Sequence, residues 1–145
     1  MLSNLFLKTY FFFLRLVRGF KRRIIFLRLG YKPNADISHD LRIKEPKNIT
    51  IGNNVKIGEE VTIGAMCNVV IEDNVTISQG VLIETGSLSL SEGTREHKCK
   101  RIHIKKGAWL AARCIILGGV TIGEGALIGA NKVIRKDVNP REIIN

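Results

Sequence analysis

The sequence predicts an all-β domain, a parallel β-helix built from a six-residue repeat, preceded by a short N-terminal helical segment. Ile or Leu opens each repeat, and Val, Ala or Cys stands fifth in nearly all of them. Because side chains alternate between the two faces of a strand, the first and fifth residues both point inward, and three repeats close one coil. A period of six does not match the 3.6-residue period of a helix. The opening residues stand at positions 51, 57 and 63, then 71, 77 and 83, then 104, 110, 116, 122, 128 and 134.

The segments around the clear repeats complete the predicted domain, which is expected to span residues 32–140. It should contain an inserted loop at about 85–101, and a short tail should follow at 141–145. Gly-Asx and Gly-Glu pairs early in the repeats are expected to turn the chain, because Gly and Asn tolerate positive φ. The residues that indicate a first coil of weaker repeats are Ile37, Leu41, Ile43 and Ile49.

The composition fits one domain with an aliphatic core and anionic partners. The chain has 145 residues, of which 45% are apolar and only 6% aromatic, so Ile, Val, Leu and Ala must fill the interior. Its net charge of +10 favours anionic partners, namely phosphates, nucleic acid or an acidic membrane surface. The sequence contains no P-loop, dinucleotide-binding motif, metal-ligand cluster or nucleic-acid recognition motif. We therefore expect neither a metal nor a nucleic-acid partner.

The three cysteines, Cys67, Cys99 and Cys114, are odd in number and show no Cys-x-x-Cys spacing. This pattern indicates neither a disulfide framework nor a metal site, and a reducing cytoplasm is the expected setting. Cys67 and Cys114 fall within repeats, so we expect them to be small core residues.

Residues 1–31 are apolar, aromatic and basic without a single acid, and predict an amphipathic helical segment that ends near Gly30. The basic residues Lys8, Arg15 and Arg18 interrupt the apolar run, which argues against a transmembrane helix, and the order of charges does not fit a signal peptide. Two interpretations remain open. The segment packs on the domain or on a neighbouring subunit, or it holds the protein at an anionic membrane face, which would be the inner one.

The late repeats carry the most specific motifs. They read IKKGAWLA at 104–111, GVTIGEGALIGA at 119–130 and VIRKDV at 133–138. Over residues 25–140 the chain resembles the left-handed β-helix acyltransferases of the hexapeptide-transferase superfamily. Within that superfamily it is most similar to colanic-acid-type exopolysaccharide and maltose-type O-acetyltransferases. The resemblance implies a left-handed coil, a homotrimer, acetyl-CoA as co-substrate and a sugar hydroxyl as acceptor, in the biosynthesis of a surface polysaccharide.

The resemblance also implies a donor site in the groove between two subunits. Small residues of the late coils would hold the pantetheine arm of acetyl-CoA, although small residues also pack at the corners of any β-helix. A basic pair would meet the CoA phosphates, and Trp109 would stack on the acceptor sugar or seal a subunit contact. The residues at the positions of the donor site are Ala111, Ala112, Gly129, Ala130, Arg135 and Lys136.

The general base is where this sequence departs from the family. The family uses a His within a T-G-S-H-type motif, and the corresponding residue here is Leu88, which cannot accept a proton. His97, in the inserted loop, is the candidate substitute, and Glu84 is a candidate carboxylate beside the acceptor. His103 and His39 are weaker candidates for the base. The alternative is a catalytically impaired trimer with a scaffold or regulatory role.

Overall fold

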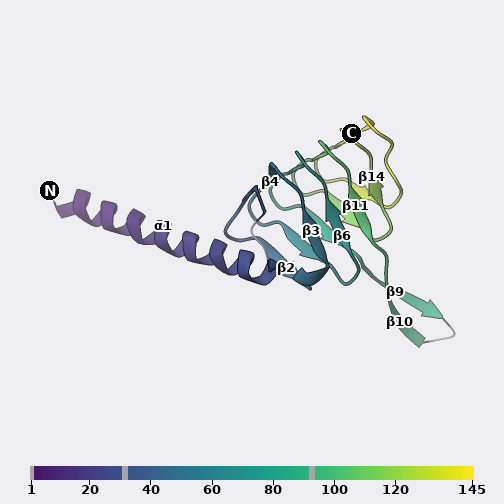
Figure 1. Ribbon diagram of the computed structural model, residues 1–145, viewed down its shortest axis with the longest axis horizontal. Coiled ribbons are helices and arrows are strands. Elements are labelled where there is room, and N and C mark those ends of the chain that lie inside the picture. Colours follow the sequence, from purple (N-terminus) through teal and green to yellow (C-terminus); the bar gives the residue numbers. More distant parts are fainter. Residues whose placement is uncertain (1, 31–32, 92–93) are drawn as a thin grey trace.

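The computed structural model describes residues 2–30, 33–91 and 94–145, which form one helix followed by a parallel β-helix (Figure 1). The strands succeed one another in a fixed cycle around three faces, so that strands adjacent in space come from successive coils. In the described residues, the side chains that open the repeats point into the interior, as the six-residue period predicts. The all-β fold and the N-terminal helix are thus confirmed.

The three faces of the solenoid are sheets of six, five and four strands. The six-stranded sheet comprises, in order, β1 (Ala35–Ile37), β4 (Val55–Ile57), β7 (Thr76–Ile77), β12 (Trp109–Leu110), β15 (Leu127–Ile128) and β17 (Ile143–Ile144). The five-stranded sheet comprises β16 (Val133–Ile134), β13 (Ile115–Leu117), β8 (Leu82–Glu84), β5 (Thr62–Gly64) and β2 (Arg42–Lys44). The four-stranded sheet comprises β14 (Thr121–Ile122), β11 (Ile102–Ile104), β6 (Val69–Ile71) and β3 (Ile49–Ile51).

Aliphatic ladders fill the interior. The residues that open the repeats are register partners from coil to coil, as Ile57 is of Ile77 and Ile116 is of Ile134. Each of them is at most 6% exposed, and most of the fifth residues are buried beside them. Burial of about 25 cal/mol per Å² of apolar surface makes this stack the main source of stability, and no single coil could supply it. The weak first coil is confirmed by the burial of its predicted residues, Ile37, Leu41, Ile43 and Ile49.

At the corners of the coils, the role of glycine differs from the prediction. The residue with positive φ stands fourth in the repeat, where Asn54 (φ 54°), Glu60 (φ 58°) and Gly80 (φ 69°) are found. The glycines in second place have no positive φ and are required for a different reason. A Cβ at Gly123 would overlap the backbone of Asn139 in the next coil. Second-place glycine therefore permits close approach between coils, while the fourth residue makes the turn.

The inserted loop predicted at about 85–101 is an antiparallel hairpin of β9 (Gly86–Ser91) and β10 (Thr94–Cys99). It leaves the solenoid between β8 and β11 and projects away from it, as Figure 1 shows. A 3-10 turn, η1 (Pro46–Asn48), lies at the same corner two coils earlier. Residues 141–145, expected as a short tail, contain β17, which pairs with β15 and extends the six-stranded sheet.

The hairpin brings together two cysteines that the sequence left unpaired. Cys67 and Cys99 form a disulfide with a Cα–Cα distance of 5.6 Å, across 32 residues of sequence. The prediction of no disulfide, and of Cys67 as a core residue, was therefore wrong. The pairing depends on where β10 rejoins the solenoid, which residue spacing does not reveal. Cys114 is fully buried, as predicted, and burial raises the pKa of its thiol to about 11.

The N-terminal segment is one helix, α1 (Leu2–Leu29), followed by Gly30 at φ 75°, which is typical of the residue after a helix end. Its last turns pack on the first coil through Ile25 and Leu29, each 6% exposed. The Arg28 guanidinium donates to the carbonyl of Ile43 at 2.7 Å. Within the described residues, no helix is long and apolar enough to cross a membrane.

Candidate active site

A cleft of about 520 Å³ opens at the corner that follows the five-stranded sheet, beneath the hairpin. We call this corner the hairpin corner. The cleft combines an imidazole, carboxylates, a hydroxyl and a lysine, and its size is within the range of small-molecule sites. Its lining residues are Lys44, Glu45, Gly64, Met66, Glu84, Gly86, Ser87, Leu88 and His97.

His97 is the direct cross-strand partner of Leu88 in the hairpin. Directly opposed residues of an antiparallel pair project to the same face, so both side chains belong to one side of the hairpin. Both line the cleft. The structure therefore places an imidazole next to the position where the resemblance expects the catalytic His, and it does so from the opposite strand.

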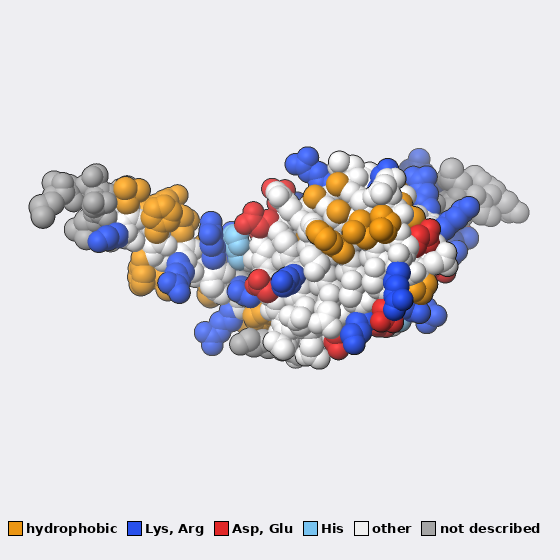
Figure 2. All heavy atoms as spheres, turned by 90° about the horizontal axis from the view of Figure 1, so that it is seen from above, with side chains coloured by type: hydrophobic (Ala, Val, Ile, Leu, Met, Phe, Trp, Pro, Cys, Tyr) orange, Lys and Arg blue, Asp and Glu red, His pale blue; other side chains and the backbone are white. Residues whose placement is uncertain are grey.

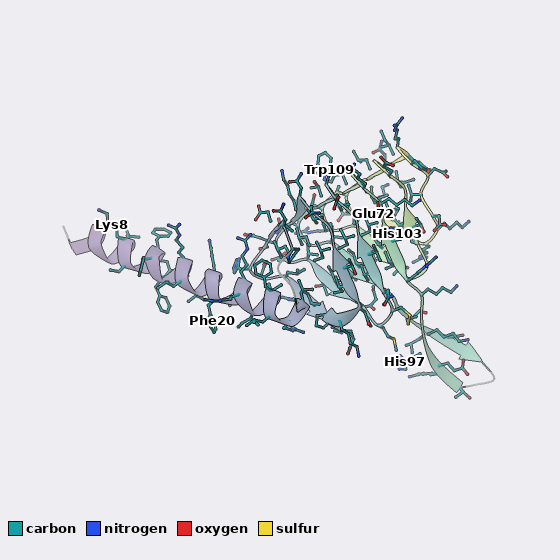
Figure 3. The ribbon with its side chains drawn as sticks, viewed as in Figure 1. Lys8, Phe20, Glu72, His97, His103 and Trp109 are labelled. Carbon is teal, nitrogen blue, oxygen red and sulfur yellow. A yellow bond between two sulfur atoms is a disulfide. The ribbon has the colours of Figure 1, made fainter. Side chains whose placement is uncertain are left out.

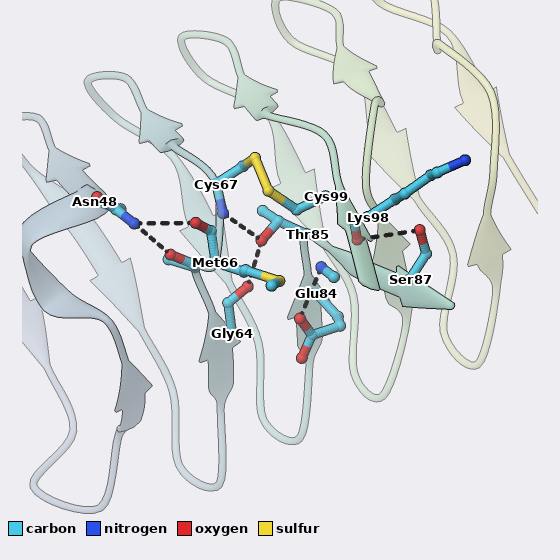
Figure 4. The surroundings of a disulfide bond; sticks show 11 residues. Asn48, Gly64, Met66, Cys67, Glu84, Thr85, Ser87, Lys98 and Cys99 are labelled. Carbon is cyan, nitrogen blue, oxygen red and sulfur yellow. Dashed lines mark hydrogen bonds between the residues drawn. A yellow bond between two sulfur atoms is a disulfide. The ribbon is translucent and has the colours of Figure 1, made fainter. Parts of the chain in front are cut away.

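Glu84 lies in the same cleft, at the end of β8, just before the hairpin begins (Figure 4). Its Oε1 accepts a hydrogen bond from the backbone N–H of Gly86 at 2.9 Å. Gly64, its register partner in β5, leaves space for the carboxylate, because a Cβ there would collide with Glu84. The sequence-predicted carboxylate and the candidate base are thus brought into one cleft, 13 residues apart along the chain.

Thr85 anchors the root of the hairpin, and sequence reasoning missed it. Its side chain is fully buried; Oγ1 donates to the carbonyl of Gly64 and accepts from the N–H of Cys67, both at 3.0 Å (Figure 4). Its carbonyl accepts from the N–H of Lys100 at 3.1 Å. Together with the disulfide, these bonds fix the point at which both hairpin strands leave the solenoid, and so they position His97 over the cleft.

Arg135 and Lys136 lie at the same corner, both exposed, after the last strand of the five-stranded sheet. Glu84 is the register partner of Leu117, and Ile116 is the partner of Ile134, so Arg135 stands two coils beyond Glu84. At about 4.8 Å per strand, the separation along the sheet is roughly 10 Å. The predicted basic pair is therefore on the same edge of the solenoid as the cleft.

The four small residues of the predicted donor site lie at a different corner, between the six-stranded and five-stranded sheets. Successive coils stack there, since the N–H of Ala111 donates to the carbonyl of Ile128 and the N–H of Asn131 to that of Ala112. Ala111, Ala112 and Gly129 are half-buried, whereas Ala130 is exposed. A Cβ at Gly129 would lie 2.7 Å from the carbonyl oxygen of Ile144, so stacking alone explains this glycine.

Trp109 stands on the outer face of the six-stranded sheet, where it is 51% exposed. Its Nε1 donates to the Oγ of Ser78 at 3.1 Å, which fixes the ring along the sheet. Its register partner is Leu127, which pairs in turn with the exposed Ile143, so the outer face is apolar at this end. Figure 3 shows Trp109 and His97 on opposite sides of the solenoid, so one chain does not bring them together.

The structure also pairs His103 with a carboxylate that the sequence did not single out. His103 Nε2 lies 2.6 Å from Glu72 Oε1 on the outside of the four-stranded sheet. The backbone N–H of Lys106 first, and then the hydrogen bond and charge of His103, lower the pKa of Glu72. Both lie away from His97 in Figure 3 and outside the lining of the cleft. His39, the remaining candidate, lies beside α1 in a pocket with Arg15 and Arg18.

Comparison with known proteins finds relatives of the solenoid. Residues 101–136 match the family described as bacterial transferase hexapeptide (six repeats). A hexapeptide-repeat acetyltransferase of Vibrio cholerae O1 biovar eltor, solved in complex with acetyl-CoA, superposes with a TM-score of 0.78 at 27% identity, over 84% of this chain and 69% of that one. A maltose O-acetyltransferase of Clostridium difficile 630 gives a TM-score of 0.78 at 25% identity, over 84% of this chain and 67% of that one.

A curated relative from Staphylococcus aureus (strain COL) is 44% identical over 46 residues, which are 32% of this chain and 23% of that protein. The chain therefore spans about a quarter of the length of the curated relatives it matches. The similarity to these sequences is concentrated in less than a third of the chain, while the similarity in fold extends over most of it.

Proposed function

We propose that this chain, a member of the hexapeptide-repeat acyltransferase superfamily, transfers an acetyl group from acetyl-CoA to a sugar hydroxyl. The observation that carries the proposal is the cleft that His97 and Glu84 both line, on a solenoid whose fold is similar to that of an acetyl-CoA-bound relative. A maltose O-acetyltransferase among the similar structures supports the sugar acceptor. The role we infer from the resemblance is the acetylation of a surface polysaccharide or its precursor.

The residues of the cleft suit acyl transfer by general base catalysis. In the proposed step, the His97 imidazole takes the proton of the acceptor hydroxyl while its oxygen bonds to the thioester carbonyl carbon. A backbone N–H stabilises the resulting oxyanion. The carbon–sulfur bond then breaks, and the CoA sulfur leaves with the proton from the imidazolium. Glu84 is placed to accept a hydrogen bond from the acceptor, so its role would be in binding.

Acetyl-CoA is a co-substrate, and the described residues fit it in part. Arg135 and Lys136 are exposed cations on the same edge of the solenoid as the cleft, roughly 10 Å beyond Glu84, and they suit the phosphates of CoA. Ala111 and Ala112 present a corner without bulky side chains, where a thin pantetheine arm could lie against the backbone. Gly129 supports the site less, because the next coil already demands its small size.

A second subunit would complete the site. In one chain, the hairpin corner and the corner that holds Ala111 and Ala112 lie at opposite ends of the strands of the five-stranded sheet. A groove that uses both corners therefore needs two copies side by side. The apolar outer ladder of Trp109, Leu127 and Ile143 offers surface for such a contact. We therefore propose a homotrimer, in which one subunit supplies His97 and its neighbour supplies Ala111 and Trp109.

The test measures CoA thiol release from acetyl-CoA in the presence of maltose and a panel of other sugars. The substitution His97→Asn should reduce kcat by about 100-fold or more, since general base catalysis contributes at least that factor. CoA affinity, measured by calorimetry, should change little. His39→Asn is the matched control, because His39 lies beside α1 and outside the cleft. Full activity in His97→Asn would refute the proposed base.

Leu88 favours a second function, that of a catalytically impaired trimer with a scaffold or regulatory role. A Leu at the position of the usual base cannot carry out proton transfer. Under this alternative the wild-type chain shows no acetyl transfer with any sugar, and Arg135→Gln/Lys136→Gln changes nothing measurable in CoA binding. Acetyl transfer above the rate of a His97→Asn sample would exclude it.

A further inference from the structure

The helix α1 carries an apolar face that its own chain leaves uncovered. At 3.6 residues per turn, residues seven apart share a face, so Phe13, Phe20 and Leu27 form one row. These side chains are 63%, 67% and 76% exposed. The helix contacts the solenoid through Ile25 and Leu29, which point in roughly the opposite direction. The row therefore faces away from the protein along a helix about 42 Å long.

Basic residues border this apolar face: around the helix, Arg23 stands about 60° to one side of Phe20 and Lys21 about 100° to the other. Along α1, Phe12, Leu16 and Phe20 recur every four residues, and Arg15, Gly19 and Arg23 form the adjacent row. These six residues line a shallow groove of about 510 Å³. Apart from its neighbours in the chain and the backbone of the helix itself, no atom lies within 4 Å of the place where a Cβ of Gly19 would be, so the groove stays open between the two arginines. An apolar row beside a basic row is the arrangement of helices that lie in a membrane interface.

The charge of the segment points to an anionic surface. The first acid of the chain is Asp36, and the preceding residues include eight Lys and Arg. Figure 2 shows basic side chains interspersed with hydrophobic ones along the helix. Several copies of α1 packed together would have no acid to offset their positive charge, whereas anionic lipid headgroups neutralise it. This favours lipid over a second copy of the helix as the occupant.

We propose that α1 lies flat on an anionic lipid bilayer. Its Phe13–Phe20–Leu27 face enters the boundary of the acyl chains, and Lys21 and Arg23, which flank Phe20 on either side and are both exposed, bind lipid phosphates at the headgroup level. The solenoid then stands beside the membrane, attached through Ile25, Leu29 and the bond from Arg22 to Asp36 (3.1 Å). This binding does not depend on the proposed acetyl transfer.

The test is co-sedimentation of the full-length protein with vesicles of phosphatidylcholine alone or of phosphatidylcholine mixed with phosphatidylglycerol. We expect binding to the mixed vesicles, reduced by high salt. Phe13→Ser should weaken it about tenfold or more, because it removes a buried aromatic side chain. Phe11→Ser is the matched control, because Phe11 is also 63% exposed but lies on the opposite face of the same turn. The Phe11→Ser protein should bind the vesicles as the wild type does.

A second pair of variants tests the charge. Lys21→Gln/Arg23→Gln should abolish the preference for anionic vesicles, while Lys47→Gln/Lys56→Gln, which removes two exposed charges from the solenoid, should preserve it. Equal binding to both vesicle types would overturn the proposal, as would equal loss in the Phe11 and Phe13 variants. Concentration-dependent self-association that Phe13→Ser abolishes, without vesicle binding, would assign the face to a second copy instead.

Discussion

His97 and Leu88 face each other across the β9–β10 hairpin as direct register partners. Because opposed residues of an antiparallel pair project to one face, an imidazole at either position reaches the same cleft. A residue that is lost on one strand can therefore be replaced from the other without any change in the solenoid. Neither residue contributes to the core, since both side chains are exposed.

The first prediction follows from this pairing. The exchange variant Leu88→His/His97→Leu should keep at least about a tenth of the wild-type kcat, whereas His97→Leu alone should lose about 100-fold or more. CoA thiol release measures both. The exchange preserves the composition of the hairpin, so a folded exchange variant that binds CoA but has no activity would show that position 88 no longer reaches the substrates.

The second prediction concerns the cysteines. A thiol reagent should find no reactive thiol in the folded protein, because Cys67 and Cys99 are joined and Cys114 is buried with its pKa raised to about 11 by burial. Unfolding should expose one thiol, and unfolding with reduction should expose all three. Three thiols after unfolding without reductant would show that the two hairpin cysteines are not joined in the purified protein.

The third prediction contrasts two identical substitutions. Gly123→Ala should lower the free energy of unfolding by about 2 kcal/mol or more, because the new Cβ would overlap the backbone of Asn139 and Pro140 in the next coil. Gly19→Ala should instead raise the helicity of α1, since its Cβ would meet no atom beyond its own helix and Ala is favoured over Gly by about 1 kcal/mol within a helix. Urea unfolding measures the first effect, and circular dichroism the second. A neutral Gly123→Ala would contradict the close packing of the coils.

The fourth prediction concerns pH. The N–H of Lys106, followed by His103, lowers the pKa of Glu72 below its ordinary value of 4.5. A carboxylate with a lowered pKa stabilises the folded state above its unfolded pKa, and this contribution disappears as the pH falls through the folded value. The Glu72→Gln protein should therefore have a lower free energy of unfolding than the wild type above about pH 4.5. The difference in free energy between the two proteins should shrink in more acidic solution.

The size of that effect is limited by solvent. The Glu72 side chain is 38% exposed, so the difference should stay below about 1 kcal/mol. Thermal unfolding at a series of pH values measures it, and Glu124→Gln, a substitution of an exposed carboxylate, is the control. A Glu72→Gln difference that grows as the pH falls from 5 to 3 would contradict the assignment.

The sequence by itself determined the solenoid, because the six-residue period decides which side chains point inward. A residue such as Ile77 lies in the core wherever the coils stack, since every sixth residue meets its equivalent in the next coil. The same local logic indicated the end of α1 near Gly30 and the burial of Cys114. These features depend on period and residue type, which are readable along the chain.

Only the tertiary structure decided the site. The pairing of His97 with Leu88 depends on the register of β9 with β10. The disulfide of Cys67 with Cys99 and the contact of His103 with Glu72 depend on where the chain rejoins the solenoid after the hairpin. An insertion breaks the six-residue period, so the partners across it cannot be counted from the sequence. The repeat fixes which residues point inward, whereas the outward contacts depend on which coils and corners lie side by side, and the chemistry of this protein is on its outside.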